Sequence, residues 1–161
     1  MKNLIYSSIL LVFGLFSSCS KTSEGVAPTT FFKCKIDGKA YSISGTGAYA
    51  TVFSATKNNI YGSEVGDTKI TTPRTMYLSL DNTLGVGTNP ITVKSNCFFE
   101  DTDKTTYNSN FNNTLVEKGT ITITEKTTTS LKGTFSFQAF SFTNPVKKIV
   151  VTEGEFSVLF R

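Results

Sequence analysis

Apolar and polar residues alternate along most of the chain beyond residue 30, with the period of two that is typical of β-strands buried on one face. The clearest segment is FFKCKIDGKAYSIS (31–44), in which apolar residues from Phe32 onward share one face and lysines the other. Asp37-Gly38 interrupts the alternation. An Asp-Gly pair between two alternating runs is typical of a two-residue β-turn, because both central residues take positive φ. The pattern therefore predicts a β-hairpin.

The same alternation recurs to the end of the chain. The further segments are RTMYLSLDN (74–82), ITVKSNCFF (91–99), GTITITEK (119–126), KKIVVT (147–152) and EFSVLF (155–160). No convincing helical period of 3.6 residues occurs outside the N-terminal segment. About nine or ten short strands, joined mostly by hairpins, predict an all-β fold, either an antiparallel β-sandwich or a flattened barrel.

Several local signals refine this expectation. Asn58-Asn59 predicts a turn between two strands, and Glu153-Gly154 predicts a tight turn near the end of the chain. The apolar parity flips at Ala139-Phe140, which predicts a β-bulge or a strand end. Lys147-Lys148 is typical of charge that protects an exposed strand edge.

The first residues form a different unit. An apolar stretch, Leu4–Phe16, follows Lys2, as in a secretory signal, and it is shorter than the roughly 20 apolar residues that a membrane-spanning helix needs. It runs into LFSSCS (15–20), which resembles the bacterial lipobox, with Phe16 where leucine is usual. The resemblance implies that Cys19 is diacylated and becomes the mature N-terminus. The alternative is a plain secreted protein.

The chain thus divides into three parts. Residues 1–18 are expected to be a lipoprotein signal peptide, residues 19–29 the lipidated cysteine and a flexible tether, and residues 30–161 a single β domain. The tether is small and polar, a composition that cannot bury apolar area. About 130 residues are enough for one domain of ordinary size.

The composition of the chain excludes several functional classes. The sequence has no histidine and no tryptophan, with 14 Phe and 6 Tyr, and its net charge is +4. Without histidine, Ser-His-acid and Cys-His hydrolases are excluded. The weak, dispersed positive charge does not predict nucleic-acid binding. We therefore expect a protein that is not an enzyme, carries no cofactor and binds no nucleic acid.

Two cysteines remain after Cys19. Cys34 and Cys97 both lie on the apolar side of their predicted strands. In an exported protein they could form a disulfide. They could equally be two separate buried thiols that act as small hydrophobic residues.

An acidic, Asn-rich segment follows the strand that ends near residue 99. Glu100, Asp101 and Asp103 supply hard oxygen ligands of the kind that Ca²⁺ prefers, but their spacing lacks the glycine and terminal glutamate of an EF-hand loop. The alternative is a solvated acidic loop.

Aromatic residues are expected on the outside of the domain as well as inside it. The outward candidates are Phe31, Tyr77, Phe98, Tyr107 and Phe111. Such residues could stack on a glycan or contact a partner protein. They could equally be the scattered exposed aromatics of any β domain.

The two ends of the domain resemble a known family. FKCKIDGKAYS (32–42), GTITITEKTTTSLKGTFSFQAF (119–140) and VTEGEFSVLF (151–160) are similar to motifs of small β-rich lipoproteins of Bacteroidota, classed as a domain of unknown function. The resemblance covers most of residues 30–161 and has few motifs in the middle. It implies an outer-membrane setting and brings no catalytic residues.

These observations predict a non-catalytic, lipid-anchored protein of the outer membrane that serves as a binding or structural module. Its partners would be the membrane, through the lipid, and a protein or glycan. Whether the domain faces the periplasm or the cell surface stays open. The alternative is an accessory protein that binds a glycan or another small ligand, with Ca²⁺ as a candidate ion.

Replacing the lipidation residue tests the anchor. We expect Cys19→Ser to abolish incorporation of labelled palmitate and to release the protein from the membrane fraction, because the acyl chains supply the membrane affinity. Cys34→Ser is the matched control and should keep the label. Labelled, membrane-bound Cys19→Ser protein would contradict the lipobox interpretation.

Overall fold

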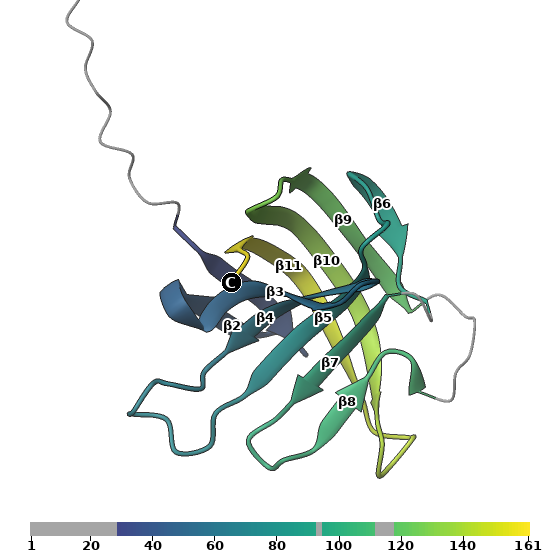
Figure 1. Ribbon diagram of the computed structural model, residues 1–161. Helices are drawn as coiled ribbons and strands as arrows, with labels where there is room; N and C mark the ends of the chain where they lie inside the picture. The colour runs from purple at the N-terminus through teal and green to yellow at the C-terminus, as the bar shows by residue number, and fades with distance from the viewer. Residues whose placement is uncertain (1–28, 93–94, 112–117) are drawn as a thin grey trace, which may run out of the picture.

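Eleven β-strands make up the computed structural model, which describes residues 29–92, 95–111 and 118–161 (Figure 1). They are β1 (Phe31–Ile36), β2 (Lys39–Ser44), β3 (Ala48–Ser54), β4 (Lys57–Ser63), β5 (Thr75–Asp81), β6 (Gly87–Pro90), β7 (Asn96–Glu100), β8 (Thr106–Asn108), β9 (Gly119–Lys126), β10 (Ser130–Ser141) and β11 (Lys148–Leu159). A short 3₁₀ turn, Gly45–Gly47, links β2 to β3. The predicted all-β class is confirmed, with one strand more than the upper expectation.

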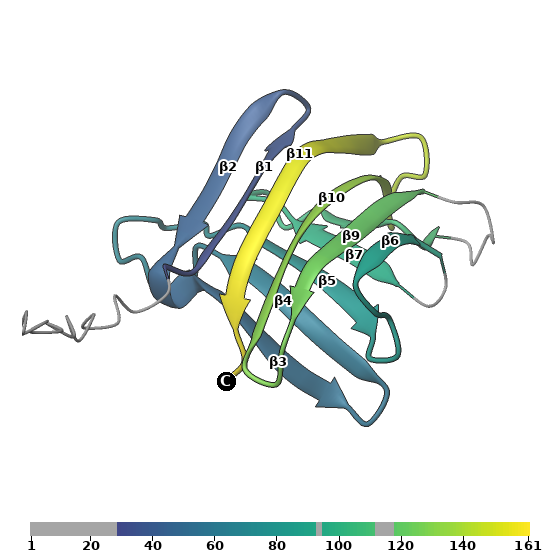
Figure 2. The ribbon, with the colours of Figure 1, turned by 90° about the horizontal axis from the view of Figure 1, so that it is seen from above.

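The strands form one antiparallel sheet that nearly closes into a barrel. The order is β2-β1-β11-β10-β8-β7-β5-β4-β3, and β9 and β6 continue the sheet from β10. β10 is shared, since Leu131–Phe137 pairs with β9 whereas Phe140 and Ser141 pair with β8. At the other side, Ala50 forms a parallel bridge with Phe160, so β3 meets the end of β11 (Figure 2).

The inward-facing residues form one continuous core. Phe32 packs on Phe135 with ring centroids 5.0 Å apart, and Phe135 lies 6.3 Å from Phe156. Across the barrel, Tyr41 lies edge-on to Phe99 at 6.1 Å. Burial of each such ring stabilises the fold by roughly 1.5–3 kcal/mol. This explains why phenylalanine is so abundant in a short chain.

The first hairpin is as the sequence predicts. Phe32, Cys34 and Ile36 are buried, and Asp37 and Gly38 form the turn with φ values of 48° and 80°. The positive φ at both positions is what a two-residue hairpin requires. The residue pattern and the turn signal are both local, so neither depends on the rest of the fold.

The predicted turn at Asn58-Asn59 is wrong. Both residues lie inside β4 and are buried, and the chain turns earlier, at residues 55–56. Asn59 pairs in register with Thr51 and Ser79, and its side-chain amide donates to the Tyr61 hydroxyl over 3.0 Å. Two flanking strands and a side-chain partner override the preference of asparagine for turns.

The predicted turn at Glu153-Gly154 is a bulge within a single strand. β11 runs without interruption, and its pairing with both β10 and β1 shifts register at this point. Glu153 has a φ of 52°, and Gly154 lies so close to Phe135 that a Cβ would be 2.5 Å from its carbonyl oxygen. Of the two alternatives predicted at Ala139-Phe140, the bulge is absent, because β10 keeps its parity with Ala139 buried. The strand end is close to the prediction, since β10 ends at Ser141.

Lys147-Lys148 does not protect a sheet edge. Lys148 is the first residue of β11, and β11 lies between β10 and β1 in the middle of the sheet. The two lysines instead stand at one end of the barrel.

Gly62 offers a test of the core geometry. A Cβ at this inward position of β4 would be 2.5 Å from the ring of Phe32. We therefore expect Gly62→Ala to lower the free energy of unfolding by about 1–3 kcal/mol in chemical denaturation. Gly85→Ala, where a Cβ meets nothing within 4 Å, is the control. Equal stability of the two variants would contradict the packing described here.

Candidate functional site

A basin of about 440 Å³ lies at one end of the barrel. It lies among the β1–β2 turn, the β7–β8 turn and the β10–β11 turn. The lining residues are Ile36, Asp37, Lys39, Arg74, Phe99, Asp101, Thr102, Tyr107, Lys147, Lys148 and Ile149. Its volume falls within the range of small-molecule sites, roughly 300–1,000 Å³.

The floor of the basin is apolar. Ile36, Phe99, Tyr107 and Ile149 are all buried and belong to the core. They come from four strands, β1, β7, β8 and β11, which end or begin at this level. The basin is therefore where the core reaches the surface between three turns.

The rim of the basin carries charges of both signs. Asp37 accepts a hydrogen bond from the Val150 backbone N–H over 2.8 Å, which helps to hold the turn. Among the described residues, the side-chain ammonium groups of Lys39 and Lys148 have no hydrogen-bond or ion-pair partner. They are the cations of the rim that are free to pair with a ligand.

Unlike Lys39 and Lys148, Lys147 has side-chain partners. Its Nζ lies 5.5 Å from the centre of the Tyr107 ring and 3.5 Å from Asp103. A hydrogen bond with Tyr107, and then the nearby Asp103 carboxylate, raise the pKa of Lys147 above its ordinary value. Lys147 therefore stays protonated at any physiological pH.

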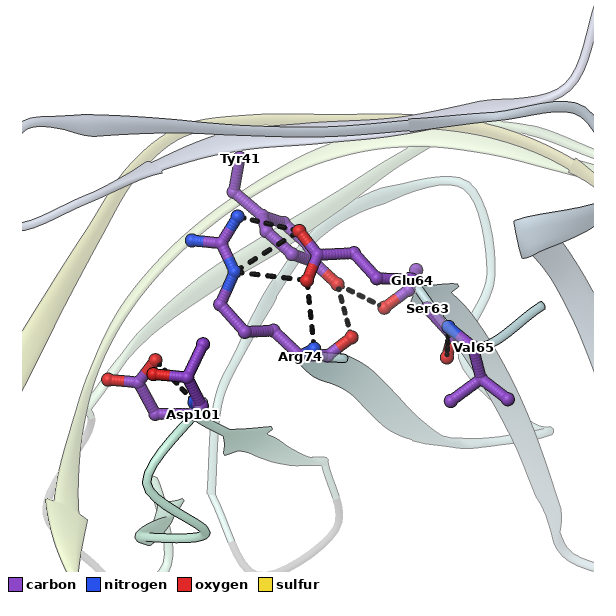
Figure 3. Close-up of polar contacts among 8 residues, drawn as sticks. Tyr41, Ser63, Glu64, Val65, Arg74 and Asp101 are labelled. Atoms are coloured by element: carbon purple, nitrogen blue, oxygen red, sulfur yellow. Dashed lines mark hydrogen bonds and ion pairs between the residues drawn. The ribbon is translucent and has the colours of Figure 1, made fainter. Parts of the chain in front are cut away.

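Arg74 forms one wall of the basin and is fixed by Glu64 (Figure 3). Arg74 Nη2 lies 2.6 Å from Glu64 Oε1, Nε donates to both carboxylate oxygens, and the Arg74 backbone N–H donates to Oε2 over 2.8 Å. The Glu64 side chain is only 11% exposed. This multidentate contact joins the end of β4 to the start of β5.

Tyr41 supports the same pair from inside. Its hydroxyl donates to the Gly62 carbonyl over 2.6 Å, and the Arg74 guanidinium lies 5.0 Å above its ring. Burial raises the pKa of Tyr41 well above its usual range. The phenol thus remains a neutral donor, and it ties β2 to β4 and to the residue before β5.

The three acidic residues proposed for Ca²⁺ are not assembled as a ligand set. Glu100 pairs with Lys104 at 2.9 Å, Asp103 accepts from the Thr105 backbone N–H, and Asp101 accepts from the Thr102 backbone N–H. Over the described ranges, no group of three His, Cys, Asp or Glu side chains lies close enough to share a metal ion. The carboxylates stabilise the β7–β8 turn instead.

The two cysteines are separate. Cys34 and Cys97 are free and buried, so the disulfide is not formed and the alternative of two apolar thiols applies. Burial raises the pKa of Cys34 to about 12 and that of Cys97 further. Neither thiol forms a reactive thiolate near neutral pH.

An aromatic ladder crosses the outer face of the sheet. We use this name for Tyr49, Tyr61, Tyr77 and Phe98, which stand in register on β3, β4, β5 and β7. Successive ring centroids are 4.9, 5.5 and 4.4 Å apart, with interplanar angles of 16°, 34° and 16°. The guanidinium of Arg161 covers Tyr49 at 4.3 Å. The ring faces are therefore occupied by one another.

The other aromatic candidates lie apart from the ladder. Phe31 is half-buried on β1 with the Lys33 ammonium 5.1 Å from its ring centre, and Phe111 packs edge-on against Phe142 at 5.8 Å. The outward placement predicted for Tyr107 is wrong, because Tyr107 lies in β8 and is 2% exposed. The polar, Asn-rich sequence around Tyr107 predicts a loop, but residues 106–108 form β8, and the strand directs the Tyr107 ring into the core.

Sequence reasoning missed most of the basin. Arg74 follows Pro73 in a polar stretch and gave no signal, and Lys39 and Lys148 belong to strands that are far apart in the sequence. Tyr49 and Tyr61 were also missed as outward aromatics. Alternation along β3 and β4 could have found them, but only the register across strands shows that they form a ladder.

No protein-family model, curated protein or solved structure matches the chain. The similarity to the lipoprotein family therefore stays a prediction. Cys19, the signal peptide and most of the tether lie outside the described residues. Within the described part, no helix is long and apolar enough to cross a membrane.

Acid stability tests the Arg74–Glu64 pair. Burial alone would raise the pKa of Glu64, but hydrogen bonds from Arg74 outweigh it and lower the pKa below its ordinary value of 4.5. Ionised Glu64 thus stabilises the fold above that value, and the contribution is lost as the pH falls through the folded-state pKa. We expect Glu64→Gln to cost about 2 kcal/mol at neutral pH, with a smaller difference from the wild type in acid.

The control is Glu153→Gln, which removes one partner of an exposed pair with Lys35. Exposed pairs contribute little, so this variant should unfold almost as the wild type does. Urea titrations over the acid range measure both. A constant gap between Glu64→Gln and the wild type at every pH would contradict the role given to the ionised carboxylate.

Proposed function

We propose that this protein is a non-catalytic, lipid-anchored binding module of the bacterial outer membrane, and that the basin is its ligand site. The LFSSCS segment around Cys19 and the polar tether after it support the anchor. The absence of histidine argues against Ser-His-acid and Cys-His hydrolysis. The observation that carries the proposal is the basin itself, which places unpaired lysine side chains beside apolar residues at the end of the core.

The aromatic ladder does not support glycan stacking. A sugar stacks on the open face of an aromatic ring, whereas each face between neighbours in the ladder touches another ring. Cross-strand aromatic pairs of this kind stabilise a sheet. The ladder therefore has a structural role, and ligand binding belongs to the basin.

Two unpaired ammonium groups of the basin favour an anionic ligand. The lining includes four cationic residues and two acidic ones. Arg74 pairs with Glu64, and Lys147 pairs with Asp103. Asp37 and Asp101 keep their negative charge and accept backbone N–H groups, whereas the ammonium groups of Lys39 and Lys148 are free to pair with a ligand above the apolar floor. A small ligand with an anionic group and an apolar part is complementary to this arrangement.

Titration of the full chain tests the basin. We use benzoate as the anionic, apolar probe and benzyl alcohol as its neutral counterpart. Benzoate should raise the melting temperature, because a ligand that binds only the folded protein stabilises it by RT ln(1 + [L]/Kd), and benzyl alcohol should shift it much less. Lys148→Glu should reduce the affinity for benzoate about tenfold, as expected when an ion pair worth ~1.4 kcal/mol is lost.

Lys69→Glu is the matched control, because it makes the same charge change at an exposed residue that does not line the basin. It should bind benzoate as the wild type does. Equal shifts with both probes, or equal losses in both variants, would argue against an anion site in the basin.

A further inference from the structure

The described sheet has three strand edges, and only one of them is both long and open. β6 has four residues and ends in Pro90, which lacks an N–H. β3 is joined to β11 by the Ala50–Phe160 bridge, and the Arg161 N–H donates to the Ala50 carbonyl over 3.0 Å. β2 stands at the margin of the sheet with no strand beyond it (Figure 2).

Half of the backbone groups of β2 face outward from that margin. In an antiparallel pair, every second residue exchanges backbone hydrogen bonds with the neighbouring strand. In β2 these residues are Lys39, Tyr41 and Ile43, which pair with β1. Gly45 continues the series, since its N–H donates to the Thr30 carbonyl over 2.9 Å. The N–H and C=O groups of Ala40, Ser42 and Ser44 therefore point away from the sheet. No described backbone group pairs with them. They are positioned to pair with another strand.

The side chains at these positions do not block such pairing. Ala40, Ser42 and Ser44 are small, uncharged and exposed. Sheet edges that avoid association usually carry lysine, proline or a bulge, and these three positions have none of them. The contrast with β6, which ends in proline, indicates that β2 is an edge suited to association.

A groove of about 320 Å³ lies beside the C-terminal end of β2. Its lining includes Ser42, Ser44 and Thr46 on one side and residues 63–67 and Ile70 on the other. Glu64 and Asp67 are its only charged residues, and Glu64 is already paired with Arg74. Asp67 accepts one backbone N–H, from Lys69, and otherwise faces solvent. The groove therefore has one carboxylate available for a cation.

We propose that β2 pairs antiparallel with β2 of a second copy of this chain, with Ser42 of each copy on the two-fold axis. In this register Ala40 lies opposite Ser44 of the second copy, so small residues meet along the outer face. Lys39 of the second copy then lies opposite Gly45, beside the groove. Its side chain has the parity of Tyr41 and Ile43, which is the face on which the groove opens.

Charge complementarity selects a second copy over another partner. Lys39 has no partner among the described residues, and Asp67 is the available carboxylate of the groove. The two-fold axis brings Lys39 of each copy to Asp67 of the other, so the contact forms twice, as in an isologous interface. One strand pair is small for a stable dimer. Anchoring both copies on one membrane would raise their effective concentration and so the fraction of dimer. The extent of dimerisation in the cell therefore rests on the proposed anchor.

Cysteine cross-linking tests the register. Residues opposite one another in a hydrogen-bonded antiparallel pair have Cα atoms about 5.5 Å apart, within the range of a disulfide. We expect the purified full chain with Ser42→Cys, in detergent under mild oxidation, to form a covalent dimer. The control is Ser136→Cys, an exposed position on β10. Cys34 and Cys97 are buried in both. Equal cross-linking of the two variants would overturn the proposal.

Charge exchange tests the partner independently. Lys39→Glu and Asp67→Lys should each lower the dimer fraction in sedimentation equilibrium several-fold, and the double variant should restore it. Lack of restoration, or a wild-type protein that is monomeric across micromolar concentrations, would also overturn the proposal. If the protein is monomeric, the alternative partner for the open edge of β2 is an extended segment of another protein. Lys39 also lines the basin, whereas Ser42 and Asp67 do not. Ser42→Cys and Asp67→Lys therefore distinguish failure of the dimer from failure of the ligand site.

Discussion

The shared edge of β10 determines how the whole sheet closes. Its first half pairs with β9 and its second half with β8, while β11 follows its other side from end to end. A strand with two successive neighbours on one side must divide the sheet, and the right-handed twist turns the two branches toward each other. The inward rings of Phe32, Phe135 and Phe156 then meet across a small space. The closed shape of the core follows from this division.

Local patterns in the sequence predicted the strands well and the details at their ends poorly. The hairpin at residues 31–44 was predicted because alternation and an Asp-Gly turn are both short-range signals. Asn58-Asn59 and Glu153-Gly154 read as turns for equally local reasons. In the structure both pairs lie inside strands: Asn58-Asn59 pairs with β3 and β5, and Glu153-Gly154 forms a bulge in β11 between β10 and β1. The fold class was therefore predictable, whereas strand order and register were not.

The basin could not be predicted from the sequence, because it depends on strand order and register. Arg74, Lys148 and the floor residue Tyr107 come from separate segments, and nothing in any one segment indicates that they meet. Tyr107 was assigned to the surface because Asn-rich sequence surrounds it, yet its pairing with β7 and β10 turns it inward. The outward assignments of Tyr77 and Phe98 were correct, but their mutual stacking, which decides their role, is a property of register.

The pairing of β1 with β11 has a consequence for how the protein is made. β1 pairs with β2 and with β11, and β11 (Lys148–Leu159) is the last strand along the chain. The N-terminal hairpin therefore cannot complete its pairing until nearly the whole chain has been synthesised. Contacts between such distant segments slow folding because a long loop must close first. A nascent chain of this topology cannot complete its sheet before the last strand has left the ribosome. Such a delay would favour the export that the proposed signal peptide implies.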